Sequence, residues 1–211
     1  ILPSINLTFR LSDDMNIRAA ASQTVARPSF KEKSGAEIYD PITKRTFIGN
    51  IDLEQTLVQN YDLRWEWFIT PRELISVAGF YKRFDGHIEL VSFPTAPDNL
   101  SPRNSGIATL FGVEFEIRKA LSAAEEGILR NLFVGANLSL VQSAVDLQSV
   151  QVNEEGKTEY DLRNDFARID GNGNQVEDID RFRPMAGQSP YAINGNITYE
   201  SKETGTSVSV A

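Results

Sequence analysis

The sequence predicts an all-β protein whose antiparallel, up-and-down strands form a transmembrane β-barrel. Three observations lead to this prediction. Apolar and polar residues alternate with period two along most of the chain, several alternating runs reach about ten residues, and short turns alternate with long polar connections. Strands of globular proteins are typically about 5–6 residues long, whereas strands that cross a membrane need about 9–11.

Eight strands are expected, and each is an alternating run bounded by turn-forming residues. The clearest run, 61–69, places a row of aromatic and aliphatic residues on one face and Asp62, Arg64 and Glu66 on the other. In the dry core of a β-sandwich such charges would be buried without water, whereas inside a wide barrel they would face water. In chain order the expected strands are 5–11, 17–24, 61–69, 75–81, 113–118, 132–140, 191–199 and a last one that begins at 206.

The connections between these strands differ in length in a regular way. Short turns are expected at 12–16, 69–73 and 201–205, with a medium one near 122–130. Long polar loops are expected at about 27–56, 85–106 and 146–189, and all three fall at the same end of an up-and-down sheet. Loops longer than about 12–15 residues are uncommon unless they are functional. Outer-membrane barrels show this asymmetry, with short periplasmic turns and long extracellular loops.

The composition excludes several classes of function. The chain of 211 residues has no Cys, a single His (His87) and a net charge of -8. The lack of Cys excludes disulfides, thiol nucleophiles and Cys-ligated zinc, and one His excludes sites that need two imidazoles. The acidic balance argues against a nucleic-acid partner, because phosphate binding needs clustered Lys and Arg. We expect no enzymatic activity and assign no catalytic residue.

Several segments resemble the barrel of the TonB-dependent outer-membrane receptors. Residues 23–30, QTVARPSF, are similar to the family's ARPSF segment. Residues 49–54, GNIDLE, followed by 60–66, NYDLRWE, match its GNPDL and NYDLG pattern, with Ile51 where Pro is usual. Further matches are FYKRFD at 80–85, GVEFE at 112–116 and GQSPY at 187–191. The matches are collinear and cover nearly the whole chain.

The resemblance implies that residues 1–211 are part of a larger, 22-stranded barrel in the bacterial outer membrane. The chain begins without a signal segment and ends inside an alternating run, so we expect a C-terminal barrel fragment of about eight strands. The plug domain and the remaining strands would lie outside it. The implied function is active import, driven by TonB, of a bulky and scarce nutrient such as a siderophore, glycan, peptide or cobalamin.

The implied partners follow from the same resemblance. They are the TonB complex, through the missing N-terminal region, the outer-membrane lipid, a small-molecule or oligomeric nutrient, and a surface lipoprotein. Two alternatives stay open from the residues alone. One is a passive or adhesive outer-membrane β-barrel without energy coupling, and the other is a soluble β-sandwich binding module.

Two groups of loop residues are candidates for binding. Aromatic side chains in the long loops could stack on a sugar or a siderophore, or could simply pack the loops together; they are Tyr39, Phe47, Phe93, Tyr160 and Phe166. In the acidic stretch 165–180, oxygen-bearing side chains are spaced as in the opening of a calcium loop; they are Asp170, Asn172, Asn174 and Asp178. Gln175 and Arg181 stand where an EF-hand needs Gly and Glu, so a solvated acidic loop is the alternative. No cofactor other than this Ca²⁺ is expected.

Arg27 and Pro28 are expected to mark the exit from a strand. Pro has no amide hydrogen to donate, so it belongs where the ladder of hydrogen bonds ends. A structural role is therefore predicted for this pair in preference to ligand contact.

Overall fold

The computed structural model describes residues 1–93, 96–121, 131–150, 157–165, 172, 180–201 and 204–210. Within these ranges, no helix is long and apolar enough to cross a membrane.

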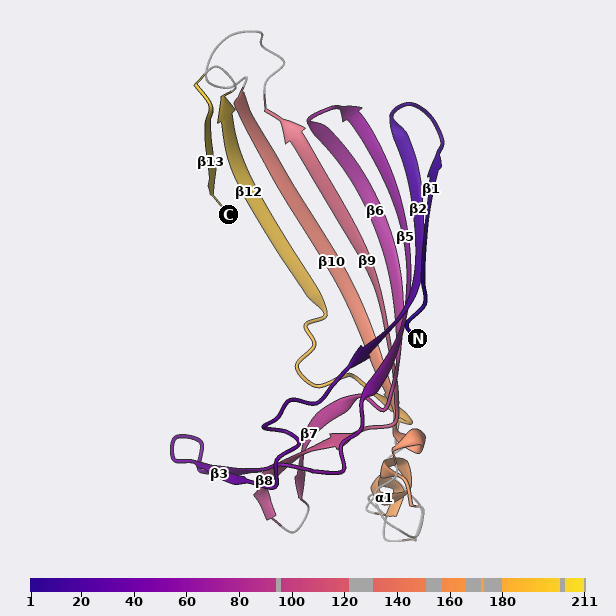
Figure 1. The fold of residues 1–211 in the computed structure, drawn as a ribbon, viewed down its shortest axis with the longest axis vertical. Coiled ribbons are helices and arrows are strands. Elements are labelled where there is room, and N and C mark those ends of the chain that lie inside the picture. The colour runs from indigo at the N-terminus through magenta and orange to yellow at the C-terminus, as the bar shows by residue number, and fades with distance from the viewer. Residues whose placement is uncertain are drawn as a thin grey trace.

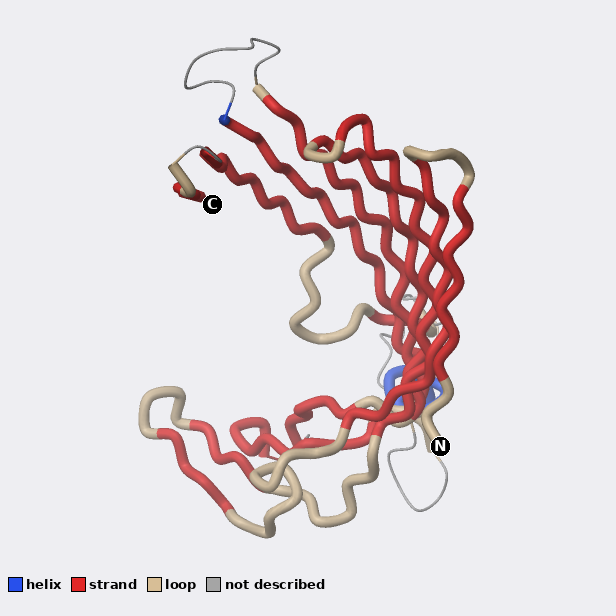
Figure 2. The backbone as a smooth tube through the Cα atoms, turned by 45° about the horizontal axis from the view of Figure 1, so that its top comes forward, coloured by secondary structure: helices blue, strands red, loops and turns tan. Residues whose placement is uncertain are grey.

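Eight antiparallel strands form one curved sheet in the described part of the chain, and we call this sheet the wall (Figures 1 and 2). Each strand pairs with its neighbour in this order, so the eight predicted strands and their up-and-down arrangement are confirmed. A short strand, β11 (Phe182–Arg183), pairs with the far end of β10. In spatial order the wall strands are β1 (Ser4–Arg10), β2 (Met15–Ala26), β5 (Thr56–Thr70), β6 (Glu73–Asp85), β9 (Ile107–Ala120), β10 (Leu132–Asp146), β12 (Tyr191–Ser201) and β13 (Thr206–Val210).

One face of the wall is apolar across its whole width. The pairing register aligns one apolar residue from each of seven strands in a row, namely Phe9, Ile17, Trp65, Val77, Phe115, Leu138 and Ile193. Much of this face is open, since Leu63 is 58% and Ile193 70% exposed. A contiguous exposed apolar surface of this extent indicates contact with lipid or with another protein.

Polar residues bound the apolar face at both ends. Towards the long connections, the third row beyond Ile17 and Trp65 on this face is polar and consists of Gln23, Gln59, Arg83 and Thr109. Towards the short turns, Glu73 Oε1 and Lys119 Nζ form an ion pair at 3.2 Å. From Arg83 to Glu73 the strand advances about 33 Å at ~3.3 Å per residue, or about 25 Å along the membrane normal at the usual strand tilt. That height equals the apolar band of an outer-membrane barrel.

The opposite face of the wall is polar and is held by ion pairs across strands. Glu66 accepts hydrogen bonds from Nε of Arg18 at 2.8 Å and from Nε of Arg64 at 3.0 Å. Arg64 also donates to Glu116 at 2.6 Å, and Glu116 accepts a second bond from Ser76 at 3.3 Å. This ladder runs over β2, β5, β6 and β9. Opposite charges therefore compensate Glu66, which is nearly buried, as an ionised group away from water requires.

The first two long connections fold into a second sheet, which we call the mouth sheet. It consists of β3 (Glu37–Asp40), β4 (Arg45–Ile48), β8 (Ala96–Asn104) and β7 (Ile88–Phe93) in that order, with β4 and β8 parallel. It projects from the lower end of the wall towards the side around which the wall curves (Figures 1 and 2). The long polar loops predicted at 27–56 and 85–106 are long connections at one end of the wall, but the prediction did not include these four strands. These strands are short and two of them pair across distant segments, so period-two alternation has too few residues to reveal them.

The third long connection also contains regular structure. A 3₁₀ turn, η2 (Leu147–Ser149), follows β10 directly, and the helix α1 (Glu159–Asp165) comes before β11. Asp146 caps the 3₁₀ turn by accepting a hydrogen bond from the backbone N–H of Gln148.

Two glycines face each other where the wall gives way to the mouth sheet. Gly86 lies between β6 and β7 with φ 67°, and Gly106 lies between β8 and β9 with φ 44°. The backbone N–H of Gly86 donates to the carbonyl of Gly106 at 2.8 Å. Both residues occupy the left-handed region that glycine adopts without steric cost, and both strands therefore bend at the same level.

The segments 27–34 and 49–54 pack against each other at the exit from β2. Ser29 and Glu32 form a reciprocal cap, with Ser29 N to Glu32 Oε2 at 2.7 Å and Glu32 N to Ser29 Oγ at 3.3 Å. The carbonyl of Glu32 accepts from the backbone N–H of Asn50 at 2.7 Å. Gly49 lies so close that a Cβ there would be 1.8 Å from the carbonyl oxygen of Ser34.

We predict that Gly49→Ala loosens this packing, because the added methyl group collides with backbone and not with a movable side chain. The expected loss is about 1–3 kcal/mol, as for overpacking elsewhere. Gly35→Ala is the matched control, since a Cβ at Gly35 meets nothing within 4 Å. Hydrogen exchange of the amides at 29–36 in the full-length protein measures the effect. Equal protection in the two variants would contradict the prediction.

Candidate functional site

A bidentate ion pair joins the mouth sheet to the wall. Arg183 pairs with Val145 of β10, so its side chain lies on the polar face of the wall. Its Nη2 is 2.5 Å from Oε2 of Glu89, and its Nη1 is 3.1 Å from Oε1 of the same carboxylate. Glu89 belongs to β7 of the mouth sheet, which projects to the concave side of the wall (Figure 1). The polar face is therefore the inner face of the wall.

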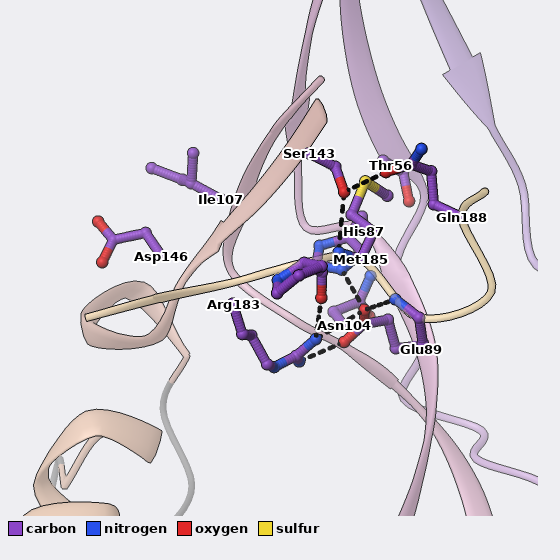
Figure 3. A network of polar contacts seen from close by, with 12 residues as sticks. Thr56, His87, Glu89, Asn104, Ile107, Ser143, Asp146, Arg183, Met185 and Gln188 are labelled. Atoms are coloured by element: carbon purple, nitrogen blue, oxygen red, sulfur yellow. Dashed lines mark hydrogen bonds and ion pairs between the residues drawn. The ribbon is translucent and has the colours of Figure 1, made fainter. Parts of the chain in front are cut away.

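His87 lies beside the same carboxylate. Its Nε2 is 3.1 Å from Oε1 of Glu89, but this nitrogen has no hydrogen-bond partner among the described residues. The residue is 3% exposed, and Nδ1 has no hydrogen-bond partner among the described residues. We call His87, Glu89 and Arg183 the mouth clamp (Figure 3).

The electrostatics of the mouth clamp keep Glu89 ionised. Burial by itself would raise the pKa of the Glu89 carboxyl, but the contacts with His87 and Arg183 outweigh it and hold the pKa far below its usual range. The hydrogen bond to Glu89 raises the pKa of Arg183 against its burial, and Glu159 adds a weaker attraction at 3.6 Å. Glu89 and Arg183 thus form an ion pair in which each charge has a partner.

A small apolar core lies next to the mouth clamp. Ala108, Val145 and Val150 are buried together, and Phe84 and Met185 pack against them. Because Ala108 pairs with Val145 on the inner face, the third connection folds onto the inner side of the wall. Hydrogen bonds reinforce this position, since Ser143 Oγ accepts from the backbone N–H of Met185 at 3.0 Å and donates to Gln188 at 2.7 Å (Figure 3).

The first connection is tied to the same place. Thr56 Oγ1 and Asn104 Nδ2 both donate to the carbonyl of Gly86, at 2.9 Å and 2.7 Å. Asn104 also accepts from the backbone N–H of Glu54 at 2.9 Å and donates to its carbonyl at 3.0 Å. All three long connections therefore meet at the clamp. The bidentate pair between Glu89 and Arg183 therefore fixes the position of the mouth sheet relative to the wall.

The candidate aromatic residues do not form one site in the described structure. Tyr39 lies on β3 and is 61% exposed, whereas Phe47 on β4 is partly buried, with Lys31 Nζ 4.5 Å from its ring centre. Ile38 is the partner of Phe47, and Thr46 that of Tyr39, so the two aromatic residues point to opposite faces of the mouth sheet. Tyr160 lies on α1, partly buried. Phe93 ends β7, but its side chain, like all of Phe166, lies outside the described residues.

The predicted calcium ligands cannot be compared with the structure. Asp170, Asn174 and Asp178 lie outside the described residues, and Asn172 is exposed. Among the residues that are described, no three His, Asp or Glu side chains are grouped so that they could hold a metal ion. Arg181, at the position where an EF-hand needs Glu, forms an ion pair with Asp146 at 2.7 Å. Calcium binding stays a prediction.

The sequence contained a local indication for only two of the three residues of the mouth clamp. His87 and Glu89 are two residues apart after Gly86, which places them on one face of a strand. Arg183 lies 94 residues beyond Glu89, in a segment whose strand has only two residues. No local pattern links the two.

We predict that Glu89→Gln detaches the third connection from the mouth sheet, because it leaves the largely buried Arg183 charge with only its weaker contact to Glu159 at 3.6 Å. Breaking such a pair costs about 3–5 kcal/mol. Asp146→Asn is the control, because it breaks the ion pair with Arg181, whose side chain is more exposed than that of Arg183. It should lower the stability of this segment by about 0–1 kcal/mol. Protease cleavage at 180–190 of the full-length protein measures both. Equal cleavage rates would show that the clamp does not anchor this segment.

The anchoring by Glu89 should depend on pH only under acidic conditions. The pKa of this carboxyl is depressed in the folded protein. Its contribution to stability is therefore complete at a pH above the ordinary pKa near 4.5, and it is lost as the pH falls towards the pKa in the folded protein. We expect amide exchange at 87–90, corrected for its intrinsic pH dependence, to accelerate progressively below about pH 4.5. Glu89→Gln should abolish this acid-induced component. An identical acid response in that variant would assign it to another group.

Comparison with known proteins identifies the wall. Residues 1–207 match the family model described as TonB dependent receptor-like, beta-barrel. The siderophore receptor PirA from Pseudomonas aeruginosa superposes with a TM-score of 0.56 at 14% identity, over 96% of this chain and 28% of that one. A mutant of the ferric enterobactin receptor PfeA from the same organism gives 0.53 at 14% identity, over 96% and 26%.

The chain thus spans about a quarter of the length of these structures, whose likeness to it is one of fold. A comparison with curated proteins finds no match. The family model covers almost the whole chain and excludes the soluble β-sandwich alternative. The chain belongs to the β-barrel family of the TonB-dependent receptors, which are receptors of the bacterial outer membrane and not enzymes.

Proposed function

We propose that the full-length protein captures a bulky, scarce nutrient at the mouth of its barrel and imports it with energy delivered by TonB. The observation that carries this proposal is the two-faced wall. An apolar band about 25 Å high faces outwards, while ion pairs and hydrogen bonds line the inner face. Such a wall encloses a polar passage, which a large hydrophilic ligand needs in order to cross the membrane.

The parts needed for energy coupling would lie outside this chain. We propose that the eight wall strands form part of a 22-stranded barrel and that a plug domain with a TonB-contacting segment occupies the rest of the protein. The family supports this arrangement. A passive or adhesive barrel is the alternative, and it would need neither a plug domain nor TonB.

The capture surface in this proposal is the mouth sheet together with the third connection. The mouth clamp holds both against the inner wall, so a ligand meets a fixed surface and loses less binding energy to the ordering of loops. Tyr39, which is 61% exposed on β3, is the residue that we assign to stacking on a ligand. A surface lipoprotein as an additional partner and Ca²⁺ in the stretch 165–180 belong to the same proposal.

Four nutrient classes remain candidates: siderophores, glycans, peptides and cobalamin. The two similar structures are a siderophore receptor and a ferric enterobactin receptor, so ferric siderophores are the first probes to use. The sequences of surface loops diverge far more readily than those of a barrel wall. Similarity of the wall therefore does not identify the nutrient class, which has to be determined by experiment.

We predict that cells expressing the full-length receptor bind and accumulate a labelled nutrient from this panel only when TonB is active. In a TonB-deficient strain, surface binding should persist while accumulation falls to background, because capture at the mouth needs no energy. Uptake of a porin substrate serves as the control for membrane integrity. Accumulation that continues without TonB would favour the passive barrel.

A further inference from the structure

A cavity of about 490 Å³ lies beside the end of β2, on the first long connection. Its lining comes from two of the segments that resemble family motifs. ARPSF provides the first residues, and GNIDL with the two residues after it provides most of the others. The lining residues are Arg27, Pro28, Lys33, Leu53, Glu54 and Gln55.

The walls of this cavity are fixed by hydrogen bonds. The reciprocal cap between Ser29 and Glu32 sets the turn that carries Lys33, and Asn50 joins that turn through Glu32. On the other side, the backbone of Glu54 is held by both hydrogen bonds to Asn104. Leu53 is 1% exposed and anchors this side in the protein. The cavity is therefore preformed.

The charged side chains of the cavity are not used for internal pairing. Among the described residues, neither Arg27 nor Lys33 forms an ion pair, although Glu54 lines the same cavity. Lys31, between them in sequence, lies over the Phe47 ring instead. Arg27, Lys33 and Gln55 are all exposed and line the same open cavity, so both cations are available to a ligand from outside.

We propose that this cavity binds an oxyanion, with Arg27 and Lys33 as the charged donors. A guanidinium offers two parallel N–H groups that match the oxygens of a carboxylate or phosphate, and an ammonium adds a compact positive charge. Gln55 supplies an uncharged amide donor. Glu54 opposes binding, which limits the affinity of the site.

Two sources can supply such a group at this end of the wall. The cavity lies beyond the polar row that contains Gln23 and Gln59, hence on the extracellular side of the apolar band. A phosphate of a lipopolysaccharide headgroup and a free anionic solute both reach this level. The proposal concerns anion binding alone and does not depend on nutrient import.

The test uses the purified full-length receptor at low ionic strength. Binding of inorganic phosphate is measured by calorimetry in detergent, and binding of lipopolysaccharide is measured with phosphatidylcholine vesicles that contain or lack it. The double variant Arg27→Gln/Lys33→Gln should weaken binding of at least one probe about tenfold or more, as expected for lost charge-assisted hydrogen bonds. The probe that responds identifies the source.

Two further variants separate binding from structural damage. Glu54→Gln should strengthen binding of the same probe about threefold, because it removes a like charge while its backbone bonds to Asn104 remain. Lys44→Gln/Arg45→Gln removes two cations of the same connection that do not line the cavity, and it should leave binding unchanged. The proposal is overturned if the pocket double variant binds both probes as the wild type does, or if the Lys44/Arg45 variant weakens binding equally.

Discussion

The pairing register of the wall is the constraint on which the rest of the structure depends. Side chains alternate between lipid and the water-filled interior, so a slip of one residue between two strands would exchange the two environments. Arg64 and Glu66 would then face hydrocarbon, where an unpaired charge is very costly, while Trp65 would face water. The cross-strand pairs Arg18–Glu66 and Arg64–Glu116 form in the observed register and reinforce it from the inner side.

The same alternation explains what could be predicted from the sequence. Runs such as 61–69 repeat the signal over many residues, and the wall strands were therefore identified in the right order. The ends were less certain, since β5 begins at Thr56, well before the first clear alternation. The mouth sheet could not be foreseen, because a four-residue strand such as β3 carries little periodic signal and the parallel pairing of β4 with β8 joins residues about 50 positions apart.

Site residues were harder to predict than strands for a related reason. Loop aromatics were chosen by residue type, and type does not decide which face of a small sheet a side chain occupies. Tyr39 and Phe47 lie close in sequence and yet point to opposite faces. The mouth clamp depends on the approach of Arg183 to Glu89 across the inner wall, and only the three-dimensional fold brings them together. Composition had excluded sites that need Cys or two His residues, but it gave no indication of a buried salt bridge.

The paired glycines at 86 and 106 mark the boundary between two regions that differ in how freely their sequences can change. On the wall side of them, each residue is constrained by the face of the sheet on which it lies and by its cross-strand partners. Beyond them, the chain leaves the membrane band, and its conformation is set by the hydrogen bonds of the mouth sheet and by the clamp. Substitutions and insertions in the mouth sheet therefore leave the wall register untouched. A receptor built in this way can acquire a new surface during evolution while it inherits its barrel unchanged.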